Sequence, residues 1–266
     1  MQLVASSKMK RAQDSARAGR AYAELLGEIL DTAQAKVGDF THPLLTKRDV
    51  KVRGILLVTP DKGMAGALNG NLIRLAAEQQ GAVFVCIGRK GAQALARSGR
   101  KILADFPVTD RANFSEVRPA AEYLIKAFTD GVVDTVEVLY AHFKNTMVQT
   151  PRVQQLLPAD SLVDQAREFR AKLGLPEPKV EDDERDMLFE PSAAAILNQL
   201  PALFFKQAVH QAVLESKASE FSARMVAMKA ATDNAKKISA ALSLEYNKAR
   251  QAAITQEILE LTAGAA

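Results

Sequence analysis

Residues 202–263 read ALFFKQAVHQAVLESKASEFSARMVAMKAATDNAKKISAALSLEYNKARQAAITQEILELTA and contain neither Gly nor Pro. Ala, Leu, Met, Glu, Lys, Gln and Arg dominate this stretch, and they lose little rotamer freedom in a helix. Pro201 precedes it, where a missing N–H costs nothing, and Gly264 follows it as a helix stop. At 1.5 Å per residue the stretch predicts one helix of roughly 93 Å, which is too long to be buried inside its own fold.

Small and apolar side chains recur along this helix in steps of four and three, the spacing of a heptad seam. The seam consists of Leu214, Ala218, Phe221, Met225, Met228, Thr232, Ala235, Ser239, Leu242, Tyr246, Ala249 and Ala253. It predicts a coiled coil, so the helix needs a partner along its length. By itself, such a seam is typical of many scaffold and filament proteins.

Residues 1–37 predict a second helix with the same spacing, in which most seam positions are Ala or Gly. Two heptad helices at opposite ends of one chain are expected to pack as a close antiparallel pair. The C-terminal helix is longer than the N-terminal one by about 25 residues, or roughly 37 Å. Its far end, beyond about Arg224, therefore has no partner within the chain. Ile238 and Leu242 must be covered by another chain or stay exposed.

The segments between the two helices alternate between strand-like and helix-like patterns. We expect strands over residues 52–59 and 82–87, a hairpin over 132–142 and 145–157, and helices over 72–80, 91–98 and 115–129. This alternation predicts a small Rossmann-like α/β domain with a mostly parallel sheet and a hairpin on one edge.

The predicted fold class is α/β plus a long antiparallel coiled coil formed by the N- and C-terminal helices. We expect three parts: a coiled-coil helix over residues 1–45, the α/β domain over 46–190, and the C-terminal helix over 191–266. Residues 158–190 are rich in Pro and acidic side chains, which predicts a short helix and a solvated loop. Ser192 is expected to cap a short helix that Pro201 separates from the long one.

The charge of the chain is unevenly distributed. The formal net charge is +4 and the pI is near 9.1, with basic residues gathered in residues 1–20 and 224–250 and acidic ones in 177–190. Basic helical ends predict an acidic partner surface. Nucleic acid is not favoured as that partner, because interleaved aromatics, zinc-finger spacing and RNA-binding signatures are missing. No apolar run approaches the length of a membrane span, and no secretory signal opens the chain.

A glycine-bearing turn over residues 60–71 is the strongest candidate for a ligand site. Gly63, Gly66 and Gly70 follow a predicted strand and precede a helix, as in a phosphate-binding loop. The spacing is not G-x-G-x-x-G, however, and no Walker A motif occurs in the chain. A tight turn that needs glycine conformations is the favoured interpretation.

The remaining reactive residues do not indicate a catalytic or metal site. Cys86 lies in an apolar strand and cannot form an internal disulfide, which favours an inert core thiol and a reducing compartment. His42, His142 and His210 fall in separate elements without metal-ligand spacing. No serine elbow or Cys–His signature for nucleophilic catalysis is present.

Two segments of the long helix resemble the C-terminal signature of the gamma subunit of F-type ATP synthases. They are SKASEFSARMVAMKAATDNA (216–235) and LEYNKARQAAITQEILELTAGA (244–265). MQLVASSKMKRA at residues 1–12 resembles the N-terminal motif of that family, and KGMAGALNGNLIR at 62–74 resembles its glycine turn. The resemblance implies an N-terminally shortened gamma subunit. It also implies that the glycine turn is not a nucleotide site.

By this resemblance, the chain is the non-catalytic central rotor shaft of a proton-translocating ATP synthase. It requires no cofactor or metal and couples rotation of the membrane c-ring to ATP synthesis or hydrolysis in the alpha/beta hexamer. Its partners are the alpha and beta subunits, the epsilon subunit and the c-ring, and it meets the membrane only through this complex. The expected location is the cytoplasmic face of the bacterial plasma membrane.

The resemblance also assigns contacts with the alpha/beta ring. The motif ARQ points to Arg250 and Gln251, with Thr255 and Glu257 on the following turns. A second contact zone, which faces an acidic beta-subunit loop, corresponds to Arg224, Lys8 and Met1. Without the resemblance, all of these residues are also consistent with a solvated helix face.

Two other functions remain open. One is a dinucleotide-binding α/β protein with a coiled-coil oligomerisation arm, in which Arg89 and Lys90 contact a 2′-phosphate. The other is a coiled-coil adaptor unrelated to ATP synthesis. Binding of NADPH or ATP to the isolated chain separates the first of these from a rotor subunit.

Overall fold

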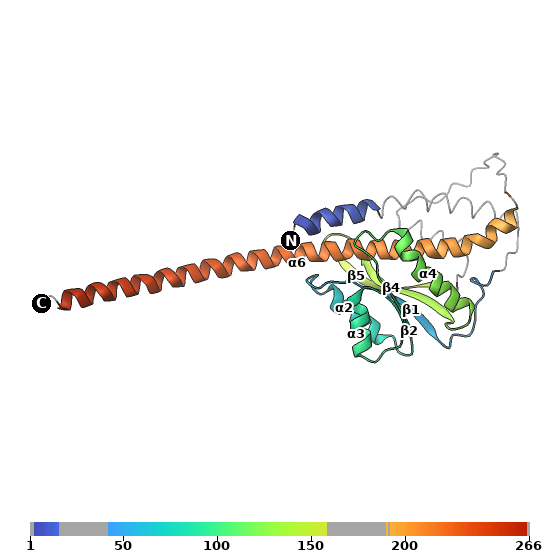
Figure 1. Ribbon diagram of the computed structural model, residues 1–266, viewed down its shortest axis with the longest axis horizontal. Helices are drawn as coiled ribbons and strands as arrows, with labels where there is room; N and C mark the ends of the chain where they lie inside the picture. The colour runs from blue at the N-terminus through green and yellow to red at the C-terminus, as the bar shows by residue number, and fades with distance from the viewer. Residues whose placement is uncertain (1–2, 16–41, 159–189, 191, 265–266) are drawn as a thin grey trace.

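A five-stranded mixed sheet forms the centre of the α/β domain in the computed structural model, which describes residues 3–15, 42–158, 190 and 192–264 (Figure 1). The strands are β1 (Arg53–Val58), β2 (Val83–Ile87), β3 (Ile102–Phe106), β4 (Thr135–Phe143) and β5 (Gln149–Leu157). Their spatial order is β3-β2-β1-β4-β5. The first four run parallel, and β5 pairs antiparallel with β4 as the predicted edge hairpin.

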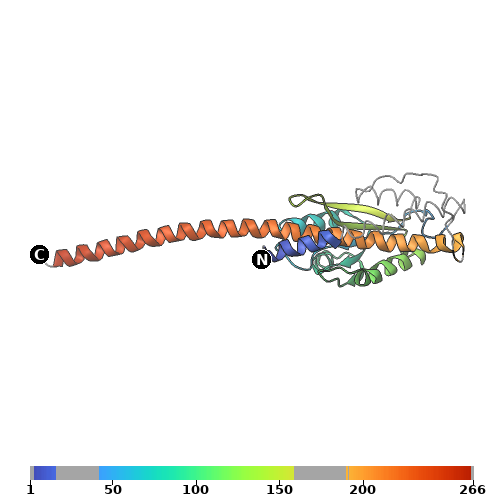
Figure 2. The same cartoon turned by 90° about the horizontal axis from the view of Figure 1, so that it is seen from above.

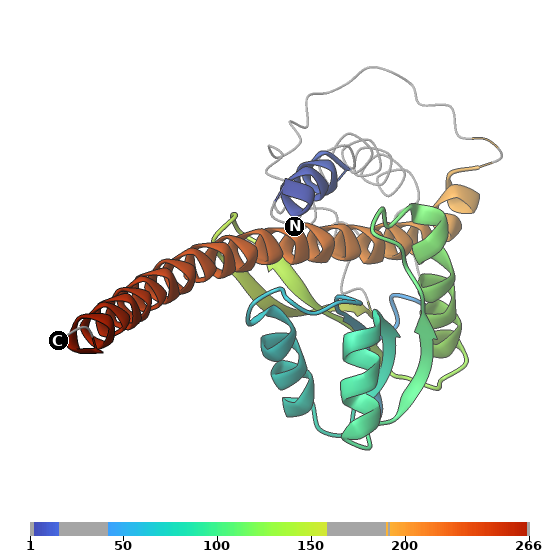
Figure 3. The ribbon, with the colours of Figure 1, turned by 60° about the vertical axis from the view of Figure 1, so that its left-hand side comes forward.

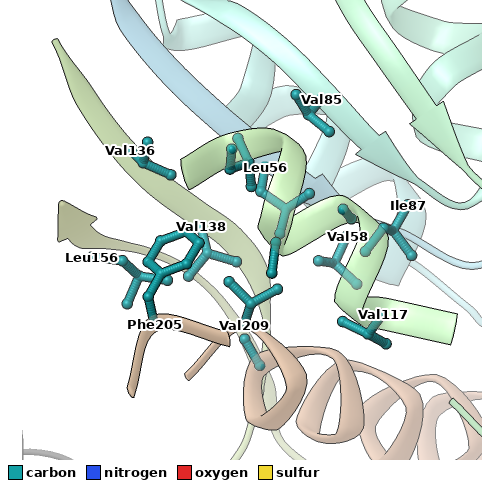
Figure 4. Close-up of a cluster of buried hydrophobic side chains, with 14 of the residues drawn as sticks. Leu56, Val58, Val85, Ile87, Val117, Val136, Val138, Leu156, Phe205 and Val209 are labelled. Atoms are coloured by element: carbon teal, nitrogen blue, oxygen red, sulfur yellow. The ribbon is translucent and has the colours of Figure 1, made fainter. Parts of the chain in front are cut away.

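Helices cover both faces of the sheet. They are α2 (Leu68–Glu78), α3 (Arg89–Arg97), α4 (Phe114–Thr129) and α6 (Ala193–Gly264). On one face, Leu56 and Val138 of the sheet pack with Val117 of α4 and with Phe205 and Val209 of α6 (Figure 4). The other face packs against α2 and α3. The central strands β1, β2 and β4 are buried on both sides, which explains their largely apolar sequences.

The long helix begins earlier than the sequence predicts. α6 runs without interruption from Ala193 to Gly264 and contains Pro201, so the expected short separate helix does not exist. Ser192 does cap its first turn, because the Ala195 N–H donates to Ser192 Oγ at 3.2 Å. The helix continues through the proline because large apolar side chains on both sides of it are buried: Leu197, Leu200, Phe204 and Phe205. Burying such side chains offsets the roughly 3 kcal/mol that a proline costs within a helix.

Element boundaries differ elsewhere by a few residues, and one strand was not predicted. α2 begins at Leu68 instead of residue 72, and α3 at Arg89 instead of residue 91. Strand β3 was missed because it lies at the sheet edge and is only half-buried, with Asp105 within it. The predicted loop and short helix over residues 158–190 lie almost entirely outside the described residues.

A helix over residues 3–15 lies beside α6 and runs in the opposite direction (Figures 1 and 2). Ala12 is buried against Ala218 and Phe221 of α6, with Met9 packed alongside. Ala5, one heptad before Ala12, is also buried. The continuation of this helix toward residue 37 lies outside the described residues.

The ends of β1 and β2 are joined through Thr59. Its hydroxyl donates to the Gly88 carbonyl at 3.1 Å and accepts from the Gly91 N–H at 2.9 Å. Gly88 has a φ of +100°, and a Cβ added there would lie 1.8 Å from the Thr59 carbonyl oxygen. Any larger residue at 88 would therefore push the two strand ends apart.

We expect Gly88→Ala to lower the free energy of unfolding by at least about 2 kcal/mol, because it combines a backbone clash with a strained φ. Urea unfolding followed by circular dichroism measures this change. Gly63→Ala is the matched control, since no atom lies within 4 Å of its added Cβ. A change within about 0.5 kcal/mol is expected there. Equal effects of the two variants would contradict the proposed role of Gly88.

Candidate partner-contact surface

The distal segment of α6, defined as residues 229–264, projects from the α/β domain as a bare helix (Figure 3). Every residue of this segment is exposed, whereas α6 has buried side chains against the domain as far as Ser222. The expectation that the far end has no partner within the chain is thus confirmed for the described residues. Its exposed large apolar side chains are Ile238, Leu242, Leu244, Tyr246, Ile254, Ile258, Leu259 and Leu261.

Part of this apolar surface forms a continuous stripe. Ile238, Leu242 and Tyr246 follow one another at intervals of four residues and line a shallow groove along the helix. They are 61 %, 59 % and 65 % exposed. A soluble chain rarely leaves so many large apolar side chains in water, and a single helix cannot bury its own stripe. The distal segment is therefore a contact surface for another molecule.

The residues expected to contact the ring near the helix end lie on this distal segment. Arg250 and Glu257 are two turns apart on one face, and Gln251 and Thr255 are neighbours one turn apart on another. The Thr255 hydroxyl donates to the Gln251 carbonyl at 2.9 Å. Among the described residues, neither Arg250 nor Glu257 forms an ion pair. Both charges therefore remain available to a partner.

Lys8 and Arg224 lie near each other where α6 leaves the domain, and both already have partners within the chain. Lys8 forms an ion pair with Asp110 and lies 5.7 Å from the centre of the Phe221 ring. This hydrogen bond from Lys8 holds the pKa of the Asp110 carboxyl below its usual range. Arg224 pairs with Glu220 at 2.8 Å and lies over the same ring, at 6.0 Å. Met1 is outside the described residues.

Polar residues that nothing in the sequence singles out hold α6 against the hairpin of β4 and β5. Ser219 and Ser222 donate hydrogen bonds to backbone carbonyls of the hairpin, and Glu215 contacts His142. Small polar residues such as serine are common on helices. The spacing of Ser219 and Ser222 in the sequence therefore does not distinguish them from ordinary surface residues.

The glycine turn brings a carboxylate to the N-terminus of α3, where a phosphate would have to compete with it. Asp61 accepts a hydrogen bond from the Arg89 N–H at 2.9 Å, so a carboxylate already occupies the N-terminus of α3. Arg89 itself lies 3.8 Å from Asp61. Burial, together with the charge of Asp61, raises the pKa of the nearby Asp105 carboxyl. Of the turn's glycines, Gly66 has a positive φ of +58°, as a tight turn requires.

The other reactive residues have structural roles. Burial raises the pKa of the Cys86 thiol to about 12, which leaves it protonated and unreactive. His210 lies 2.9 Å from the Ala112 carbonyl oxygen, and His142 lies 2.8 Å from Glu215. In the described part of the chain, no group of three His, Cys, Asp or Glu side chains is placed to hold a metal ion. None of the described helices is apolar over a length that could cross a membrane.

Comparison with known sequences identifies the family. A family model described as ATP synthase matches residues 1–266. The ATP synthase gamma chain of Opitutus terrae is 51 % identical over 99 % of this chain and 90 % of its own length. The ATP synthase gamma chain of Akkermansia muciniphila is 41 % identical over 98 % of this chain and 90 % of its own length.

Comparison with solved structures agrees with this result. A chain from the central stalk and c-ring of the Tetrahymena thermophila mitochondrial ATP synthase superposes with a TM-score of 0.60 and 26 % identity. The match covers 87 % of this chain and 97 % of that chain. A rotor chain of the Euglena gracilis mitochondrial ATP synthase shares the fold, with a TM-score of 0.56 at 18 % identity over 94 % of this chain and 99 % of that chain. With its sheet domain and bare distal helix, the chain belongs to the ATP synthase gamma chain family.

Proposed function

We propose that the chain is the rotor subunit of a proton-translocating ATP synthase and has no catalytic site of its own. It couples rotation of the membrane c-ring to ATP synthesis or hydrolysis in the ring of alpha and beta subunits, and it also binds epsilon. The observation that carries this proposal is the distal segment, a bare helix with an apolar stripe on a folded domain. The relatives are named ATP synthase gamma chains, and a structural neighbour comes from a central stalk with its c-ring.

The distal segment acts as a shaft inside the alpha/beta ring. Its faces differ, because the stripe of Ile238, Leu242 and Tyr246 is apolar while Lys236 and Lys237 bring charge to other faces. As the shaft turns, each beta subunit meets a different face. A contact that is stronger in one conformation of a beta subunit shifts its equilibrium toward that conformation.

Arg250 and Gln251 form the most specific contact with the ring. As neighbours on a helix they point about 100° apart, so they reach two groups on one enclosing surface. Arg offers a planar fork of donors, whereas Gln both donates and accepts. Thr255 and Glu257 extend this contact along the following turns.

Lys8, Arg224 and Met1 form the second contact zone, facing an acidic loop of a beta subunit. Lys8 and Arg224 lie around the Phe221 ring at the base of the shaft. Their partners within the chain, Asp110 and Glu220, hold these cations in place. An acidic loop of a beta subunit then competes with Asp110 and Glu220 for cations that are already oriented.

The three parts of the chain have different roles. Residues 1–45 contribute the N-terminal coiled-coil helix that pairs with α6, residues 46–190 contribute the foot toward the c-ring, and residues 191–266 contribute α6, whose distal segment is the shaft. The contact of Ala12 with Ala218 and Phe221 supports the pairing of the two helices. We place the complex at the cytoplasmic face of the bacterial plasma membrane, because the similar gamma chains named above include those of bacteria.

The distal segment is expected to be sensitive to proteases in the isolated chain and protected in the assembled complex. A lone helix opens locally at little cost, because its backbone hydrogen bonds are exposed to solvent and few contacts support it. Limited trypsin digestion followed by mass spectrometry locates the cuts. Equal protection of residues 229–264 in both states would contradict an enclosing partner.

ATP and NADPH are expected to leave the melting temperature of the isolated chain unchanged. A ligand bound only to the folded state stabilises it by about 2.7 kcal/mol at a hundredfold excess over Kd. Differential scanning fluorimetry with each nucleotide measures the shift. A stabilisation of that size would favour a dinucleotide-binding protein, with Asp61 displaced from the N-terminus of α3.

The double variant Arg250→Ala, Gln251→Ala is expected to change the ATP turnover of the reconstituted alpha–beta–gamma complex severalfold. Contacts enclosed by a protein ring are each worth on the order of 1 to 3 kcal/mol, against well under 1 for exposed pairs. The helicity of the isolated chain should not change. Lys236→Ala with Lys237→Ala removes charge from the same helix and should have a smaller effect. Equal turnover in the two double variants would mean that the predicted contact is not specific.

A further inference from the structure

Three polar side chains on one face of α6 bind the hairpin of β4 and β5. Glu215, Ser219 and Ser222 are spaced by four and three residues, so they project within about 60° of one another. They contact the His142 ring, the Ala141 carbonyl and the Thr146 carbonyl of the hairpin, respectively. We name these three contacts the hairpin clamp.

The central contact of the clamp satisfies a carbonyl at a proline-containing pair. Ala141 in β4 lies opposite Pro151 in β5, a residue without a backbone N–H. The Ala141 carbonyl accepts from Ser219 Oγ at 2.9 Å, and Ser219 is fully buried. An unpaired carbonyl in such a place is unfavourable, so the serine is held in one position relative to the strand.

The other two contacts of the clamp reach the tip of the hairpin and His142, the residue that follows Ala141 in β4. Ser222 Oγ donates to the Thr146 carbonyl at 2.7 Å. Asn145 stiffens the tip, because its side-chain oxygen accepts from the N–H groups of Met147 and Val148 at 2.9 and 2.8 Å. At the other end, His142 Nδ1 lies 2.8 Å from Glu215 Oε2.

We propose that the hairpin clamp fixes the rotational setting of α6 relative to the α/β domain, so that torque passes between shaft and foot through β4. Apolar contacts are non-directional and set how close a helix lies, whereas hydrogen bonds depend on angle and set how far it is turned. β4 pairs with β1 at the centre of the sheet, so a torque on β4 is passed to the rest of the domain. This inference rests on the proposed rotor function.

The position of the clamp supports this role. Two other polar contacts of α6, from Lys206 to Glu122 and from His210 to the Ala112 carbonyl, lie farther from the point where the helix leaves the domain. A longer contact of 3.4 Å, from Arg224 to the Gly63 carbonyl, lies beside the clamp on its distal side. Every residue of the distal segment is exposed. A twist applied to the distal segment therefore reaches the clamp before it reaches the contacts of Lys206 and His210.

The test measures the angular fluctuation of the foot in single complexes. The complete complex is immobilised through its beta subunits, and a gold particle is attached to the foot at Gln93→Cys, an exposed position on α3. Cys86 is buried and does not compete for the label. With the complex paused at low ATP, Ser219→Ala with Ser222→Ala should broaden the angular distribution at least twofold. ATP turnover should stay within twofold of the unsubstituted complex.

Lys206→Ala is the control, because it removes a polar contact between α6 and the domain outside the clamp. It should leave the angular distribution unchanged, and equal broadening would overturn the inference. An unchanged distribution in the serine variant would also overturn it. If the double variant does not assemble, Ser222→Ala alone is judged by the same measurement. A foot that never rotates in the unsubstituted complex would overturn the proposed function as well, which distinguishes the two failures.

Discussion

The packing of the first half of α6 against β4 and α4 is the constraint on which the rest of the molecule depends. Phe205, Val209 and Val213 fill the core on that face of the sheet, so the helix cannot leave the domain without opening it. Because the same helix continues without a break, this core also fixes the direction in which the distal segment projects. A rigid anchor and a bare end are therefore two parts of one element, and neither could transmit force alone.

The elements with a strong periodic or continuously apolar pattern were predicted well. The long helix, the central strands and the edge hairpin are present, because each follows from local composition over many residues. The half-buried edge strand β3 was missed for lack of such a pattern. The predicted break at Pro201 was wrong, because burial of Leu197, Leu200, Phe204 and Phe205 outweighs the local cost of proline.

The candidate site was predictable only in part. The exposed end of the helix followed from comparing the lengths of two helices, since that argument needs no tertiary contacts. By contrast, Lys8 lies on a helix whose sequence does not show that Asp110, about 100 residues later, pairs with it. Arg224 and Glu220 are four residues apart on one helix, so their pairing could have been predicted from the spacing. The contacts of Ser219 and Ser222 depend on where a hairpin more than 70 residues earlier in the chain ends. Such long-range polar contacts leave no periodic trace in the sequence.

The threonines of the distal segment have a consequence for whatever surrounds it. Thr232, Thr255 and Thr262 each donate their hydroxyl to a carbonyl one turn earlier in the same helix. With the proton committed to the backbone, each of them offers its surroundings a methyl group and an acceptor oxygen, but no donor. At these positions the helix can accept a hydrogen bond from a neighbouring surface but cannot donate one, so only donor groups of that surface can bind there.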